Sequence, residues 1–111
     1  MRVAIVGPCA SGKSTLAAEL STRGIDAYAV AQEHSDIIDL WARQQPGRLI
    51  YLDVSLSSLR RRRSNPFWPR WVYERQLERL ADARKHADLV VDTNVLDHDA
   101  VVALVVQRLL T

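Results

Sequence analysis

A short stretch near the start of the chain constrains its fold more than any other feature. Residues 7–15, called here the GKS segment, match the phosphate-binding pattern G-x-x-x-x-G-K-[ST] at every fixed position. The two glycines allow a tight loop whose backbone N–H groups can converge on a phosphate. We therefore expect the whole segment to contact phosphate groups: Gly7, Pro8, Cys9, Ala10, Ser11, Gly12, Lys13, Ser14 and Thr15.

The residues on both sides of the GKS segment agree with this interpretation. After Arg2, residues 3–6 are apolar and mostly β-branched, which is typical of a buried parallel strand. Residues 14–23 predict a helix that stops at Gly24. The start of that helix would point its positive dipole end at the anion, Lys13 would reach phosphate oxygens, and the Ser14 hydroxyl would ligate Mg²⁺.

The rest of the chain alternates strand and helix patterns. The expected strands cover residues 25–31, 48–54 and 87–92, and the expected helices cover residues 36–44, 56–63, 70–86 and 98–110. This alternation predicts a single α/β domain over residues 1–111, with three α/β/α layers and a small parallel sheet of about four strands.

Composition limits the classes of protein that the chain can belong to. No apolar run approaches the roughly 20 residues that span a bilayer, and the apolar run at residues 2–6 is too short for a signal peptide. The lone Cys9 excludes an internal disulfide and a cysteine-rich zinc site. We therefore expect a cytoplasmic protein without membrane partners. A net charge of only +2 argues against a nucleic-acid partner, although arginines concentrate at positions 60–63.

The order of these elements resembles the P-loop kinases of the shikimate, adenylate and nucleoside kinase type. The resemblance rests on the GKS segment, and on a strand at 49–54 followed by a short helix, an arginine cluster, a second helix and Ala-Asp-Leu-Val-Val-Asp-Thr at 87–93. It implies a P-loop NTPase fold that uses ATP and Mg²⁺, with a lid over the nucleotide at residues 64–69. The chain is shorter than these kinases between Gly24 and Arg48, the region that binds their phosphate acceptor.

Three carboxylates end apolar strands, Glu33, Asp53 and Asp92, and the first two are the candidates for the acid that serves the metal. Asp53 follows four apolar residues, as in a Walker B motif, whereas Glu33 follows the strand expected to lie beside the first one. We favour Glu33 as the metal-linked or water-activating acid, since the resemblance places Asp53 on the other side of the first strand. In the alternative reading, each carboxylate only caps a helix.

Other candidate residues follow from the charge run and from the resemblance. Arg61, Arg63 and Arg70 are candidates for stabilising the charge of a transferred phosphoryl group, unless the arginine run is only a solvated helix face. By resemblance to these kinases, Thr93 would border the adenine.

Two functions are compatible with these features. The first is transfer of the γ-phosphate of ATP to a small-molecule acceptor or to water, and the second is a non-catalytic nucleotide-binding switch or interaction module. Adenine is preferred to guanine because the chain lacks an N-K-x-D motif. A homodimer is compatible with either function.

Overall fold

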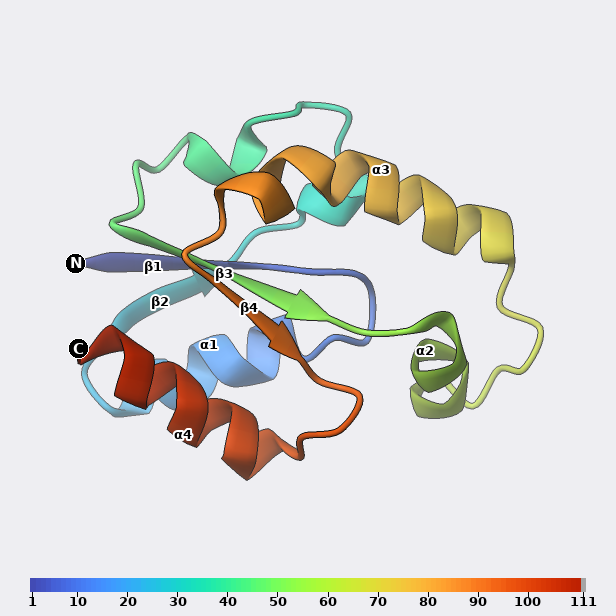
Figure 1. Ribbon diagram of the computed structural model, residues 1–111. Coiled ribbons are helices and arrows are strands. Elements are labelled where there is room, and N and C mark those ends of the chain that lie inside the picture. The colour runs from blue at the N-terminus through green and yellow to red at the C-terminus, as the bar shows by residue number, and fades with distance from the viewer. Residues whose placement is uncertain (111) are drawn as a thin grey trace.

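A four-stranded parallel sheet forms the centre of the molecule. The computed structural model describes residues 1–110, and all neighbouring strands in it run parallel in the order β2-β1-β3-β4 (Figure 1). This confirms the four parallel strands expected from the sequence. Their bounds are β1 (Arg2–Val6), β2 (Asp26–Ala29), β3 (Arg48–Asp53) and β4 (Leu89–Asp92).

Helices cover both faces of this sheet. Helices α1 (Lys13–Thr22) and α4 (His98–Leu109) lie on one face, and α3 (Arg70–His86) lies on the other (Figure 1). The short helix α2 (Leu56–Arg62) lies beyond the carboxyl ends of the strands. The three layers agree with the predicted α/β/α architecture.

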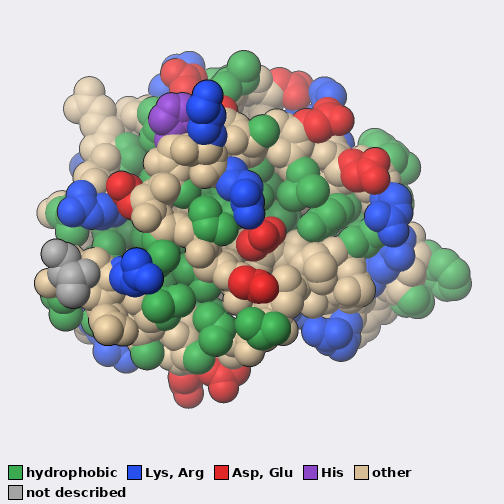
Figure 2. Space-filling model, viewed as in Figure 1, with side chains coloured by type: hydrophobic (Ala, Val, Ile, Leu, Met, Phe, Trp, Pro, Cys, Tyr) green, Lys and Arg blue, Asp and Glu red, His purple; other side chains and the backbone are tan. Residues whose placement is uncertain are grey.

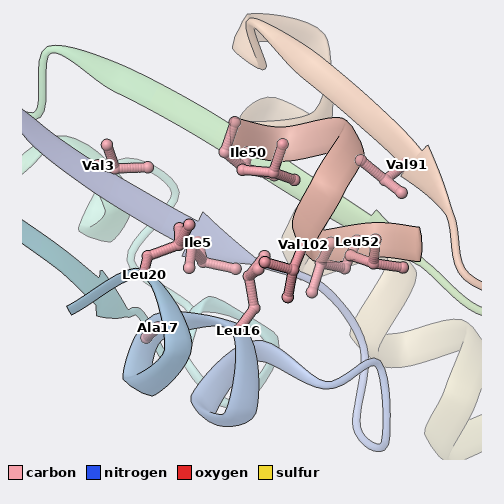
Figure 3. Packing of buried hydrophobic residues seen from close by; sticks show 11 residues of the cluster. Val3, Ile5, Leu16, Ala17, Leu20, Ile50, Leu52, Val91 and Val102 are labelled. Carbon is pink, nitrogen blue, oxygen red and sulfur yellow. The ribbon is translucent and has the colours of Figure 1, made fainter. Parts of the chain in front are cut away.

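The inner strands alternate their side chains between two apolar layers, as the two-residue period of a strand requires. On the side of α1 and α4, Val3 and Ile5 of β1 pack with residues of the helices and of β3 and β4 (Figure 3). On the side of α3, Ala4 and Val6 pack beside Tyr51. Because both faces are covered, residues 3–6 are completely buried, which explains the continuous apolar run at 2–6.

The prediction of a helix at 36–44 is wrong. The side chain of Gln32 binds backbone groups that such a helix would use for its own hydrogen bonds. In a helix, Trp41 N–H would donate to Ile37 O. Here the Gln32 amide accepts from Trp41 N at 2.9 Å and donates to Ile37 O at 2.7 Å. Within that range one turn of 3₁₀ helix forms instead, η2 (Leu40–Ala42), and another, η1 (Gln32–His34), precedes it.

Two predicted helix starts are capped by side chains. Ser55 Oγ accepts from Ser58 N at 3.1 Å at the start of α2, and Asp97 Oδ1 accepts from Ala100 N at 2.8 Å at the start of α4. Each cap satisfies one backbone donor that the first turn of a helix leaves unpaired. Among residues 1–110, no helix combines the length and the apolar character needed to cross a bilayer.

Candidate functional site

The GKS segment joins β1 to α1 and holds a backbone that requires glycine at two positions. A Cβ on Gly7 would lie 2.4 Å from Leu52 O and 2.8 Å from Ser11 Oγ, so no larger residue fits there. Gly12 precedes α1 with a φ of 94°, in the left-handed region. Ala10 also has a positive φ, 62°, which costs on the order of 1 kcal/mol in a residue with a Cβ. Strain of this kind is concentrated at ligand-binding sites.

The side chain of Lys13 folds back over the loop that precedes it. Its Nζ donates to Gly7 O at 2.9 Å and to Pro8 O at 3.2 Å, and it forms an ion pair with the Glu33 carboxylate. Only 11% of the lysine side chain is exposed. The ammonium group is thus held beside the loop by three acceptors.

Glu33 reaches the loop because β2 is the neighbour of β1. It lies in η1, just after β2, and 4% of its side chain is exposed. Its Oε2 pairs with Lys13, whereas its Oε1 is buried and has no hydrogen-bond partner within residues 1–110. The structure therefore brings Glu33 to the GKS segment, whereas the adjacent Gln32 binds the 37–41 backbone instead.

Gln76 fixes the position of Cys9 in the loop. Cys9 N–H donates to Gln76 Oε1 at 3.0 Å, and Gln76 Nε2 donates to Cys9 Sγ at 3.1 Å. The imidazole Nε2 of His34 lies 3.6 Å from the same sulfur. Gln76 is not among the site residues predicted from the sequence, although it occupies the buried stripe of α3 with Leu80 and Ala83. A buried polar residue in such a stripe is the signal that could have found it.

A hollow opens on the outer side of the GKS segment. Ser14 and Thr15, in the first turn of α1, are exposed there, and the Ser14 hydroxyl is therefore accessible to a metal ion. The residues that line it are Cys9, Ala10, Gly12, Lys13, Ser14, Thr15, Glu33, His34 and Arg63. The hollow thus combines a lysine, a buried carboxylate, a hydroxyl and an arginine, which is the set of groups that bind phosphate and a metal ion.

A second hollow shares part of the GKS segment with the first. Arg62 crosses it, donating to Ala10 O at 2.8 Å, to Thr93 Oγ1 at 3.1 Å and to Thr93 O at 2.6 Å. Its lining mixes apolar and polar side chains: Ala10, Ser11, Gly12, Thr15, Leu16, Leu52, Arg62, Thr93, Leu96, Asp97, His98 and Val101. Thr93, which we expected beside the base, is 4% exposed and lies in this hollow.

The structure separates the three arginines predicted to act on phosphate. Arg63 lines the first hollow, Arg61 donates to Ser58 Oγ at 3.3 Å and lines a different depression, and Arg70 is exposed at the start of α3. Arg62, which we did not select, is the arginine that contacts the loop. The helical period explains why Arg62 and Arg63 face the GKS segment. They lie three and four positions after the buried Leu59 and therefore share its face of the helix.

Residues 64–69, the predicted lid, form a loop that connects α2 to α3. Asn65 N–H donates to Arg60 O at 2.9 Å, and the Arg60 guanidinium donates to Trp68 O at 2.8 and 3.0 Å. Phe67 is 87% exposed. At this end of the molecule, Figure 2 shows Lys and Arg side chains beside exposed hydrophobic ones. The closure expected of a lid stays a prediction.

Asp53 ends β3 and lies among another group of side chains. Its carboxylate pairs with Arg84 at 3.4 Å, and its neighbours in a surface depression include Tyr51 and Tyr73. Burial raises the pKa of both tyrosines, so their hydroxyls stay protonated at neutral pH. The strand order places β3 on the opposite side of β1 from β2, as expected, and Glu33 is the acid that contacts the GKS segment.

The surroundings of Lys13 decide what the site can do chemically. The site combines a backbone loop, a cation, a buried carboxylate and an exposed hydroxyl. These groups lie at the carboxyl edge of a parallel sheet, where ligands bind in open α/β folds. Comparison with known families and curated proteins finds no match. The geometry of the GKS segment is therefore the basis on which a function can be proposed.

Proposed function

We propose that the chain has a P-loop NTPase fold and binds Mg·ATP at the GKS segment, transferring the γ-phosphate to a small-molecule acceptor or to water. One observation carries this proposal. The G-x-x-x-x-G-K-S pattern occupies the turn between an inner parallel strand and a helix, with glycine required at Gly7 and Gly12 and with Lys13 beside the loop. Such a loop offers backbone donors and a cation to a chain of phosphates.

Four side chains of the first hollow have a role in this proposal. Lys13 would leave the loop carbonyls and bind phosphate oxygens, and Arg63 would stabilise charge that develops on the transferred group. Ser14 and Glu33 would hold Mg²⁺ directly or through water, because a hydroxyl and a carboxylate are the oxygen ligands that Mg²⁺ prefers. The bound metal would neutralise phosphate charge.

The second hollow fits the nucleoside part of the same ligand. It begins at the GKS segment and continues between α1 and α4, with apolar walls from Leu16, Leu52 and Val101. Arg62 and Thr93 supply polar groups to its lining. A flat base needs this combination of apolar contact area and a few hydrogen-bonding groups.

A non-catalytic nucleotide-binding switch is the second candidate, and the segment between β2 and β3 favours it. That segment contains only the turns η1 and η2, so the chain provides little structure there for holding an acceptor. Phosphates that draw Lys13 away from Glu33 would change the surroundings of η1. A partner protein could then recognise the nucleotide-bound state.

Nucleotide binding is tested by thermal unfolding with and without Mg·ATP or Mg·ADP. A ligand at 100 times its dissociation constant adds about 2.7 kcal/mol, and Lys13→Met should lose most of that gain relative to its own ligand-free form. Lys85→Met is the matched control, because Lys85 is the other lysine of the chain and lies outside both hollows. An unchanged melting temperature of the wild type at millimolar nucleotide would overturn the proposal.

Turnover separates the two candidates. Release of phosphate from ATP, or its transfer to one of a panel of small hydroxyl-bearing acceptors, supports the enzyme. Saturable binding of ATP with no turnover under any of these conditions supports the switch.

A further inference from the structure

Three side chains beside the GKS segment carry the ligand types of a transition-metal site. Cys9 offers a sulfur, Glu33 an oxygen and His34 a nitrogen, and these ligand atoms all lie within 4.8 Å of one another. We propose that they bind a divalent transition metal, with Zn²⁺ as the best match. This site differs in its chemistry from a magnesium site, and the proposal does not depend on nucleotide binding.

The separation of Cys9 and His34 matches zinc coordination. Zn–S and Zn–N bonds of about 2.3 and 2.0–2.1 Å at a tetrahedral angle place sulfur and nitrogen about 3.6 Å apart. Cys9 Sγ and His34 Nε2 are 3.6 Å apart in the structure. Both atoms can therefore ligate one ion with little movement of either residue.

Glu33 supplies the third ligand and an independent argument for a cation. Its side chain is only 4% exposed and its Oε1 lacks a hydrogen-bond partner within residues 1–110, which leaves part of a buried carboxylate unsatisfied. Lys13 binds the other oxygen, Oε2. The lysine can therefore keep its ion pair and orient the carboxylate while Oε1 ligates the metal, as hydrogen-bonded neighbours of metal ligands do.

The surroundings of the sulfur favour a metal-bound thiolate. Gln76 Nε2 donates to Cys9 Sγ at 3.1 Å, a contact that stabilises an electron-rich sulfur and fixes its direction. The three ligands line the first hollow, so a water molecule can complete four-coordinate geometry from the solvent side. A sulfur, nitrogen and oxygen set selects zinc-like ions over Mg²⁺ and Ca²⁺, which prefer oxygen.

The test uses Zn²⁺ and Co²⁺ with the tag-free full chain in the absence of nucleotide. We expect calorimetry to find one Zn²⁺ per chain, undisturbed by excess Mg²⁺, and Co²⁺ to give a sulfur-to-metal charge-transfer band in the near ultraviolet. Cys9→Ser should remove that band, and both Cys9→Ser and His34→Gln should weaken Zn²⁺ binding at least about tenfold. His86→Gln is the control, because His86 stacks on Trp41 away from this site, and it should bind Zn²⁺ like the wild type.

Several results would overturn the proposal. These are no Zn²⁺ uptake by the folded wild type, a cobalt spectrum without the charge-transfer band, or wild-type zinc affinity in Cys9→Ser or His34→Gln. The cobalt spectrum needs only the wild type, so the proposal stays testable even if a variant fails to fold. Because no arm contains nucleotide, failure here is distinct from failure of the ATP proposal.

Discussion

Replacing Lys13 by methionine should destabilise the protein strongly even without any ligand. The change keeps most of the aliphatic stem but removes the cation that pairs with Glu33. The Glu33 side chain is 4% exposed and its other oxygen already lacks a partner, so the carboxylate would remain buried and uncompensated. Breaking a buried ion pair from one side costs about 3–5 kcal/mol. For Lys13→Met we expect a loss at the lower end of this range, about 3 kcal/mol of unfolding free energy. The reason is that 11% of the lysine side chain is exposed and the carboxylate borders the hollow, so water can partly solvate the charge.

This magnitude is measurable by urea denaturation and by thermal unfolding. At about 4 °C per kcal/mol for a domain of this size, a loss of about 3 kcal/mol lowers the melting temperature by about 12 °C. Glu33→Gln should cost less, about 1–2 kcal/mol, because Lys13 keeps two backbone carbonyls and an amide oxygen as acceptors. The double variant should cost less than the sum of the two single variants, by about 2 kcal/mol, since it leaves no unpaired charge.

The exposed Lys85 provides the control for this double-mutant cycle. Lys85→Met should change the free energy of unfolding by no more than about 0.5 kcal/mol. Additive single variants, or a cost below about 1 kcal/mol for Lys13→Met, would refute the reasoning, because the pair would then contribute nothing as a pair.

Three further predictions concern nucleotide chemistry. Glu33→Gln should reduce magnesium-dependent turnover or nucleotide binding more than Asp53→Asn does, because Glu33 contacts the GKS segment. The opposite ranking in a phosphate-release assay would assign the metal-binding role to Asp53. Arg63→Ala should lower turnover at least about tenfold, or about 1.4 kcal/mol of transition-state stabilisation, and Arg61→Ala should lower it less. The reason is that Arg63 lines the first hollow and Arg61 does not. Equal rates in the two variants would contradict this assignment. Hydrogen exchange at residues 64–69 should slow when a non-hydrolysable ATP analogue binds, and unchanged exchange would exclude a lid.

The parts of the fold that follow from local patterns could be predicted from the sequence. The apolar run at 2–6, the GKS segment and the helix after it specify strand, loop and helix within 22 residues. The predicted range of α3, residues 70–86, is confirmed as well, because Pro69 and Ala87 bound it. The position of Glu33 beside the loop followed from the expectation that β2 pairs with β1.

The features that could not be predicted depend on single side chains that act across long sequence distances. The Gln32 amide replaces a helical hydrogen bond between residues 37 and 41, and no propensity at 36–44 indicates this. Gln76 contacts Cys9 from a position 67 residues later. In a run of four arginines, residue type alone cannot show that Arg62 is the one that contacts the loop. The buried face of α2 does show it.

The position of β1 in the sheet has a consequence for folding during synthesis. The first strand in sequence is an inner strand, paired with β2 on one side and with β3 on the other. Until the ribosome releases residue 53, β1 has only β2 as a partner, and a two-stranded sheet is marginally stable by itself. Losing residues 2–6 would separate β2 from β3, so an amino-terminal truncation should remove the fold as a whole.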